Sequence, residues 1–266
     1  MKIGYIRVSR NDQNPALQSD ALTAAAKTAL VSEFGPSYQA LVDWFEADKA
    51  NADEIATGVG KLPNGAAFYA MRLANSTTTD MTPDAIHGLG LSEVARIQAE
   101  MSGVMKQVGF KGSLREFFDY IRTDPRFKPT SRAALQDGYY SIGKAVDANI
   151  RQLFETLPKT ALRIEPVPAL TEKGAARGSY NSGSADGARP GTFYFNAYDL
   201  PSRTTPAMTT LYLHEGAPGH HFQISLAQEN TSLPAFQRFG GNTAYVEGWG
   251  LYAETLGKEL GVLDDP

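Results

Sequence analysis

The chain has 266 residues, a length that suits one large or two modest domains and allows a sizeable core. Apolar residues make up 42% of the chain and charged residues 20%, which is an ordinary composition for a folded globular protein. The net charge of −4 argues against a general nucleic-acid binder, and the lack of cysteine excludes disulfides, iron–sulfur clusters and a cysteine nucleophile.

The N-terminal quarter predicts a short strand followed by helices. Residues Lys2–Val8 alternate well enough for a strand, and turn-forming residues separate them from a helix over Ala16–Leu30. Pro36 suits the first turn of a second helix, which we expect to run to about Ala56. Glycines and a Pro-Asn-Gly run break that helix, and a short helix is expected over Ala66–Asn75.

The middle of the chain carries strong helix signals. Thr82–Asp84 supplies a capping residue, a first-turn proline and an acid near the positive end of a helix. Ser113–Glu116 forms a capping box that begins another helix, and an apolar stripe over Leu135–Leu153 predicts a third, ended by Pro158. The first of these helices carries its own apolar stripe of helical period, made of Val94, Ile97, Met101, Val104, Met105 and Val108.

Residues 162–198 change in character. Leu162–Val167 and Thr192–Tyr198 are predicted to be strands. Between them, Gly174–Gly191 is rich in Gly, Ser, Ala and Arg and predicts a loop, long enough to favour a functional role. Helix returns at about Pro206 and continues, with breaks, to the end of the chain. Together these elements predict a mainly α fold with a small β-sheet.

One short segment holds most of the histidines. His214, His220 and His221, three of the four in the chain, fall within eight residues. A His followed directly by Glu on an apolar helix is typical of single-zinc hydrolases, in which the His binds metal and the Glu acts as general base. This pattern predicts His214 as a ligand and Glu215 as the base. The usual second His stands four positions after the first, where this chain has Pro218, so a strict HExxH motif is absent.

Two histidines are candidates for the missing ligand. On an ideal helix His221 would lie about −20° from His214, but about 10 Å further along the axis. His220 would lie on another face, unless about two residues bulge out of the helix. Pro218 favours a kink or bulge because its ring clashes with the carbonyl of His214. We favour His220 and keep His221 as a ligand or as a residue that supports one.

A carboxylate is expected to complete the site, because zinc hydrolases of this type use two His and one Glu and leave one position open. Glu247, on a separate helix, is the predicted third ligand. Glu254 is seven positions further on the same helix face and is expected to hold a ligand imidazole by its other nitrogen, with Asn196 as another supporting residue. The tyrosines that could stabilise a developing oxyanion are Tyr194, Tyr198, Tyr245 and Tyr252, with Tyr194 and Tyr252 preferred.

These residues resemble a known bacterial family, the domain of unknown function numbered 885, whose signature is HExxPGHHxQ followed by EGWxxYxE. The two motifs stand at His214–Gln223 and Glu247–Glu254. The resemblance implies a zincin-like helical metallohydrolase body of the thermolysin-like zinc peptidase clan, with Thr192–Tyr198 as the strand that holds extended substrate. Further matches occur in the right order at Lys61–Gly65, Thr77–Thr78, Ile86–Gly90, Asp186–Gly191 and Phe193–Asn196.

The chain departs from the family in two ways. Family chains are much longer, so residues 25–266 resemble a truncated zinc-hydrolase domain. Residues 1–24 form an appendage whose first 22 residues resemble the start of a resolvase-type serine recombinase, in which Ser9 would be the nucleophile and Arg7 a phosphate contact. The chain is therefore interpreted as a fusion. Recombinase activity is not expected, because the DNA-binding helices of that family have no counterpart here.

The leading hypothesis is a zinc-dependent hydrolase with one zinc per chain, in which Glu215 activates the attacking water. Its substrate stays open among peptides, activated esters and phosphotriesters. The alternative is a non-catalytic zinc-binding remnant of a peptidase, and a DNA recombinase is the least favoured reading.

Partners and location follow from what the sequence contains. No apolar run approaches the roughly 20 residues needed to span a bilayer, and the first twenty residues lack the apolar stretch of a signal peptide. We therefore expect a cytoplasmic protein that binds a small-molecule or peptide substrate, with no membrane or nucleic-acid partner. Apolar helix stripes without partners predict a homo-oligomer, most simply a two-fold dimer.

Overall fold

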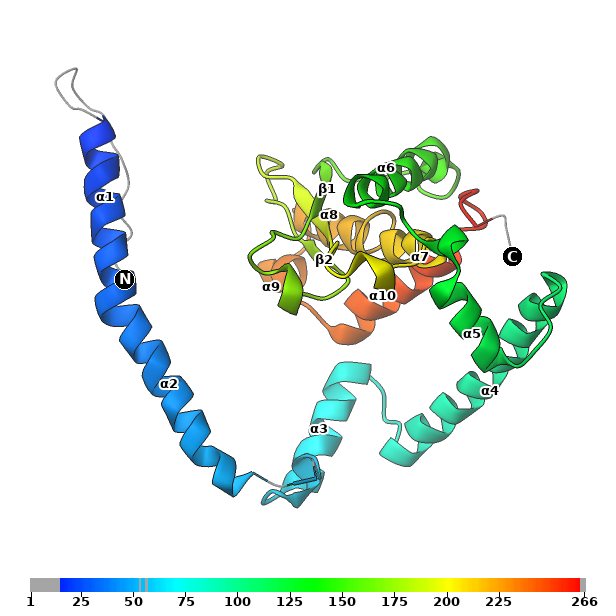
Figure 1. Ribbon diagram of the computed structural model, residues 1–266, viewed down its shortest axis with the longest axis horizontal. Coiled ribbons are helices and arrows are strands. Elements are labelled where there is room, and N and C mark those ends of the chain that lie inside the picture. Colours follow the sequence, from blue (N-terminus) through cyan, green and yellow to red (C-terminus); the bar gives the residue numbers. More distant parts are fainter. Residues whose placement is uncertain (1–14, 53, 56, 264–266) are drawn as a thin grey trace. The chain divides into compact units, whose positions relative to one another are not determined.

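The computed structural model describes residues 15–52, 54–55 and 57–263 (Figure 1). Its packing divides the chain into two units, one up to Gly65 and one from Ala66 onward. The predicted strand Lys2–Val8, with Arg7 and Ser9, lies outside the described residues. The helices are α1 (Pro15–Ala29), α2 (Gly35–Asp48), α3 (Gly65–Thr77), α4 (Pro83–Gln107), α5 (Leu114–Thr123), α6 (Arg132–Asn149), α7 (Pro206–Glu215), α8 (His220–Glu229), α9 (Ala235–Phe239) and α10 (Thr243–Thr255).

The N-terminal unit is built from α1 and α2, joined by a π-helical turn over Leu30–Phe34. Helix was predicted for both segments, but α2 ends at Asp48, earlier than the predicted end near Ala56. A short 3-10 turn and an extended Ala52 follow Asp48. Apolar side chains on this unit are exposed, Phe34 and Trp44 among them.

Helix starts in the second unit match their predicted signals. The Thr82 hydroxyl accepts a hydrogen bond from the backbone N–H of Ala85 at the start of α4. Ser113 and Glu116 form the predicted capping box of α5, each side chain accepting from the other residue's backbone N–H. These bonds satisfy N–H groups that have no partner within the helix.

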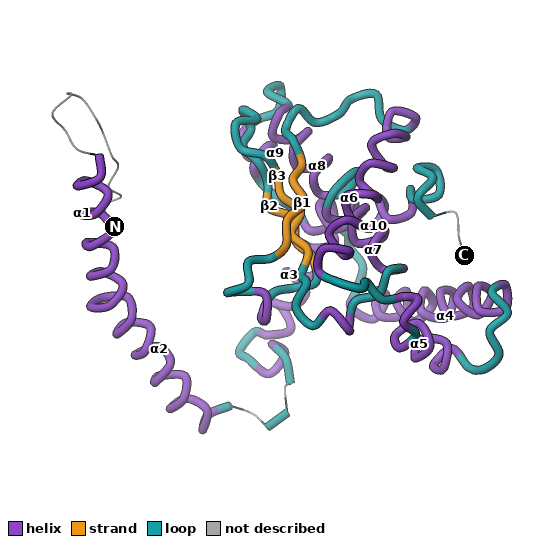
Figure 2. Tube along the Cα trace, turned by 45° about the horizontal axis from the view of Figure 1, so that its top comes forward, coloured by secondary structure: helices purple, strands orange, loops and turns teal. Residues whose placement is uncertain are grey.

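The small sheet has three strands in the order β1–β3–β2: β1 (Leu162–Pro166), β2 (Gly178–Asn181) and β3 (Gly191–Phe195). β1 runs parallel to β3, and β2 runs antiparallel to it. Figure 2 shows the three strands side by side. β2 lies inside Gly174–Gly191, so the prediction of an unbroken loop there was wrong. β3 was expected to hold extended substrate, but both of its edges are already paired, which leaves β2 as the edge strand on that side.

The core lies between one face of the sheet and the helices. Phe193 of β3 is fully buried and packs edge-on against Tyr139 of α6 and Tyr212 of α7. Val146 of α6 and Leu213 of α7 are also fully buried. Figure 1 shows α7, α8 and α10 gathered beside the sheet. This packing fixes the three helices that carry the candidate site.

The apolar stripe of α4 remains at the surface. Val94 is 52% exposed, and Ile97 and Met101 are each 39% exposed. Side chains of this kind usually lie in cores, so this face has apolar area that the described chain does not cover. Across the described part of the chain, no helix combines the length and the apolar character needed to cross a membrane.

Candidate metal centre

A break between two helices places the histidines. α7 ends at Glu215 and α8 begins at His220, so the two halves of the predicted motif lie on separate helices. Pro218 cannot donate the hydrogen bond that would continue α7, because it has no N–H. The chain turns instead, and the His221 N–H donates to the carbonyl of Gly216 at 3.2 Å. Because of this break, the direction of the His220 side chain relative to His214 is not fixed by the periodicity of one continuous helix.

Three side chains converge at this break. His214, His220 and Glu247 each offer one ligand atom, and these atoms all lie within 4.8 Å of one another. The Nε2 atom of His214 is 3.4 Å from Glu247 Oε2, and Nε2 of His220 is 3.8 Å from Glu247 Oε1. The two histidines are mostly buried, and Glu247 is the more exposed of the three. The donor set is therefore two imidazole nitrogens and one carboxylate.

Glu254 orients His214 from behind. Its Oε1 lies 2.8 Å from Nδ1 of His214. Glu247 and Glu254 are seven residues apart on α10, so both lie on the same face of that helix. With Nδ1–H donating to this carboxylate, the lone pair of Nε2 faces Glu247. Gly250 lies between the two acids on α10, and a Cβ at that position would come within 2.8 Å of the His214 ring. The approach of α10 to α7 thus depends on a residue without a side chain.

Glu215 lies next to this group without joining it. It is the last residue of α7 and is half-buried. Burial raises the pKa of the Glu215 carboxyl, while the nearby His214 and a hydrogen bond from the backbone N–H of Tyr180 act in the opposite direction. The arrangement leaves a carboxylate beside the cluster that is free to act on protons.

His221 points elsewhere. Its Nδ1 lies 3.0 Å from the Tyr180 hydroxyl and 3.4 Å from Ser225 Oγ, and the side chain is 4% exposed. Successive residues on a helix point about 100° apart, so His220 and His221 cannot both face Glu247. Burial lowers the pKa of His221 to about 4, which keeps its ring neutral. Of the two alternatives, the structure brings His220 into the cluster.

Tyr194 and Tyr252, the two preferred tyrosines, make no hydrogen bond to the cluster within the described chain. In β3 the buried Phe193 and Phe195 face the helices, so Tyr194 between them points to the opposite face of the sheet. Tyr252 is 54% exposed and packs beside the Trp249 ring, on the side of α10 away from Glu254. The part of each tyrosine as an oxyanion donor stays a prediction, and Tyr194 would have to act from the far face of the sheet.

Asn196 has a structural role in place of the predicted supporting one. Its Nδ2 donates to the carbonyls of Glu172 and Ala175, and its Oδ1 accepts from the Tyr198 N–H. The first two bonds fasten the turn before β2, and the third lies in the segment that follows β3. They explain why a polar side chain is 2% exposed without placing it near the histidines.

Sequence reasoning missed Tyr180. It lies on β2, the strand hidden in the Gly- and Ser-rich segment, and its side chain shares a face with Phe193, its register partner. Its hydroxyl lies 3.0 Å from His221 Nδ1, and its backbone N–H lowers the pKa of the Glu215 carboxyl. The segment Gly178–Asn181 has too few β-branched or aromatic residues to predict a strand. The only local signal is a lone tyrosine in a polar segment.

Comparisons with known proteins agree with this architecture. A crystal structure described as that of a "putative lipoprotein from Colwellia psychrerythraea" matches with a TM-score of 0.85 and 29% sequence identity. The match covers 96% of this chain and 44% of that one, so the chain spans less than half the length of this solved relative. No curated protein matches. The profile of the family "Bacterial protein of unknown function (DUF885)" matches residues 4–266, a range that begins inside the N-terminal appendage. The chain belongs to this family of bacterial proteins of unknown function.

Proposed function

We propose that the chain is a zinc-dependent hydrolase whose metal is held by His214, His220 and Glu247. The observation that carries the proposal is the convergence of these three side chains from three separate helices. Their donor atoms suit zinc, since hydrolytic zinc sites combine two His and one Glu and keep a further position open. The Glu254 carboxylate behind His214 is the kind of partner that fixes the tautomer of a ligand imidazole.

The protein residues have separate tasks in this scheme. When bound, zinc would lower the pKa of a water molecule and polarise a carbonyl or phosphoryl group. Glu215 would accept the proton of the attacking water and deliver it to the leaving group, because it is a carboxylate beside the cluster and is not among the ligands. The Tyr180 backbone N–H would favour the charged form of the Glu215 carboxyl.

The position of β2 at the edge of the sheet favours a peptide-like substrate. β2 pairs with β3 on one side, and Gly178 on β2 approaches the Leu211 side chain of α7 closely. An extended peptide can add to an exposed strand edge through main-chain hydrogen bonds. A peptide laid along β2 would therefore run beside the helix that carries Glu215. Activated esters and phosphotriesters remain alternative substrates, because they need little help for the leaving group.

The test joins metal content to turnover. Elemental analysis of purified protein is expected to find about one zinc per chain, lost in His214→Ala and kept in His87→Ala, a change at an exposed histidine. Glu215→Gln is expected to keep zinc but to lose about 10²- to 10⁴-fold in turnover on a panel of peptides, esters and phosphotriesters.

Other outcomes separate the alternatives. Zinc bound with no turnover on any substrate of the panel would favour the non-catalytic zinc protein. Full zinc content in both His214→Ala and Glu247→Ala would reject the metal site itself.

A further inference from the structure

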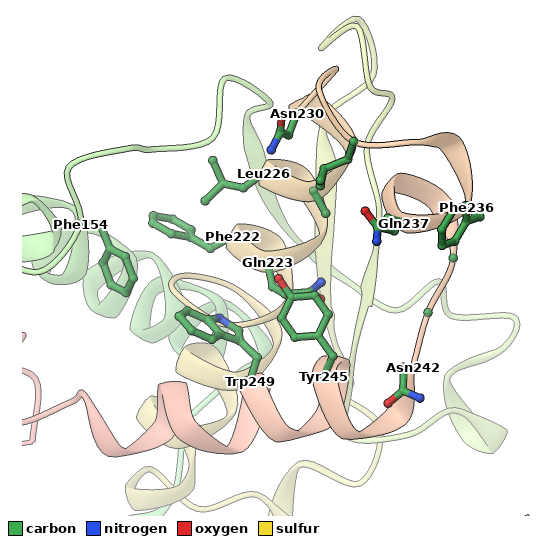
Figure 3. Close-up of a pocket in the computed structure, with 14 residues that line it drawn as sticks. Phe154, Phe222, Gln223, Leu226, Asn230, Phe236, Gln237, Asn242, Tyr245 and Trp249 are labelled. Atoms are coloured by element: carbon green, nitrogen blue, oxygen red, sulfur yellow. The ribbon is translucent and has the colours of Figure 1, made fainter. Parts of the chain in front are cut away.

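A cavity lies between α8, α9 and α10. Its volume is about 690 Å³, and fourteen residues line it (Figure 3). None of the fourteen carries a charge: they are aromatic or aliphatic side chains, glycines and carboxamides. A charged ligand would gain no counter-charge from such a lining. The lining therefore selects for a neutral occupant.

Aromatic rings form one wall of this cavity. Phe154 meets Phe222 edge-on at 5.4 Å between ring centres and meets Trp249 at 6.3 Å. The Trp249 Nε1–H donates to the Pro218 carbonyl at 2.8 Å, which fixes the indole plane. Figure 3 shows Trp249 and Tyr245 rising from α10 toward Phe222 and Leu226 of α8. The wall is thus a preformed apolar surface.

One polar group in the lining lacks a partner. Gln223 is 8% exposed, and its Oε1 is buried with no hydrogen-bond partner within the described chain. Leaving a buried acceptor unpaired costs about 1–3 kcal/mol, so such atoms are few in native proteins. Figure 3 places the Gln223 carboxamide at the cavity, between α8 and the Tyr245 ring. Rotation of this group about its last bond presents either its acceptor or its donors.

The cavity is separate from the metal centre. On α10, Tyr245 and Trp249 line the cavity, whereas Glu247 and Glu254 face His214. At 100° per residue these two pairs lie on opposite faces of the helix. An occupant of the cavity would therefore bind apart from the ligand atoms of the cluster.

We propose that this cavity binds a neutral secondary amide with an apolar side chain, the chemistry of an uncharged residue inside a peptide. The aromatic wall takes the side chain. The Gln223 carboxamide takes the amide, because it can accept from an N–H and donate to a C=O at the same time. The proposal holds whether or not the metal centre is catalytic.

The experiment uses tryptophan emission in metal-free protein. The chain has two tryptophans, so a Trp44→Phe background leaves Trp249 as the sole reporter. N-acetyl-leucine methylamide is titrated as the neutral probe, and N-acetyl-leucine, with the same side chain and a carboxylate, as its charged counterpart. We expect a saturable change in Trp249 emission with the neutral probe and a much weaker response to the charged one.

Variants at Gln223 test the polar contact. Gln223→Met keeps the length of the side chain and removes an unpaired buried amide, so folding is expected to persist. Its affinity for the neutral probe is expected to fall about 30-fold, the equivalent of two hydrogen bonds of about 1 kcal/mol each. Gln228→Met, on α8 but outside the cavity lining, is the matched control and is expected to bind normally. Ala227→Phe fills the cavity and is expected to abolish binding.

Several results would overturn the proposal. Equal affinity for the neutral and charged probes would show that the uncharged lining does not select for neutral ligands. Unchanged affinity in Gln223→Met would show that the Gln223 carboxamide does not bind the probe. A response that rises linearly without saturation, or Trp249 emission that changes with protein concentration alone, would mean non-specific contact or coverage by a second copy of the chain. Because no metal or turnover is involved, these outcomes are independent of the test of the hydrolase.

Discussion

His214 and Glu254 are joined across α7 and α10 by a hydrogen bond of 2.8 Å between Nδ1 and Oε1. The bond leaves the other ring nitrogen toward Glu247, 3.4 Å away. A single imidazole is thus placed between two acids of one helix. The orientation of the proposed ligand imidazole is therefore set by two side chains of α10.

Glu254→Gln is expected to weaken zinc binding about 10- to 100-fold, as for other partners of ligand histidines. The amide keeps the shape of the side chain but loses the charge that raises the basicity of the His214 ring. Competition with a zinc-binding dye measures the affinity. Glu259→Gln, at an exposed acid nearby, is the control, and equal affinity in the two variants would contradict the role of Glu254.

Tyr180→Phe is expected to lower the free energy of unfolding by about 1 kcal/mol, because the buried His221 loses a hydrogen bond. The three proposed ligands are unchanged, so zinc content should not change. Denaturant unfolding checks the first point and elemental analysis the second. Tyr194→Phe serves as the comparison, since Tyr194 lies on the other face of the sheet. A larger loss of stability in Tyr194→Phe would contradict the assignment.

Glu229 predicts a dependence of stability on pH. Burial raises the pKa of its carboxyl, but this is outweighed by hydrogen bonds from the N–H groups of Lys159 and Thr160 and from the Thr160 hydroxyl, so the net pKa lies below its usual value. Because the folded pKa is the lower one, the unfolded chain binds the proton first as pH falls. The stabilisation is therefore full above about pH 4.3, the unfolded value, and is lost as pH falls through the folded pKa.

The substitution Glu229→Gln turns this into a measurement. At pH 7 it is expected to lower the free energy of unfolding by about 1–2 kcal/mol, and at strongly acid pH the gap to the parent chain should close. Guanidinium unfolding at both pH values gives the two differences. A gap of the same size at both would show that the charge of Glu229 is not what matters.

The exposed stripe of α4 predicts association. Apolar patches beyond a few hundred Å² are uncommon on monomers, and Val94, Ile97 and Met101 form part of such a stripe. We expect light scattering at low micromolar concentration to give about twice the mass of one chain. Ile97→Lys should shift the protein to monomer, whereas Gln98→Lys, at the next residue of the same helix, should not. A parent chain that stays monomeric would contradict the expected dimer.

Local signals in the sequence located most of the helices. The capping residues Thr82 and Ser113 act within one helical turn, so the residues around them are enough to predict the start of α4 and α5. The strand β2 could not be predicted in this way. Gly178–Asn181 is a strand because β3 and α7 are beside it, and neither neighbour can be read from four residues.

The candidate site likewise has features that the sequence predicts and features that depend on tertiary contacts. The residue types at His214, Glu215 and Glu247 predict zinc chemistry without reference to the fold. The choice between His220 and His221 depends on where a helix breaks and restarts, which is a matter of packing around Pro218. The direction of Tyr194 depends on which face of β3 meets the helices. Residue identity therefore predicts the chemistry of the cluster, and tertiary contacts decide which side chains reach it.

The contact between Gly250 and the His214 ring has a consequence for how variation at this position is interpreted. Glycine inside a helix costs about 1 kcal/mol relative to alanine, so α10 would form more readily without it. An alanine there would nevertheless place a Cβ 2.8 Å from the imidazole. The glycine therefore serves to let α10 approach the His214 ring closely, and its backbone flexibility is not what matters. A survey of tolerated substitutions would find this position closed even to the smallest side chain, because a Cβ there would meet the His214 ring.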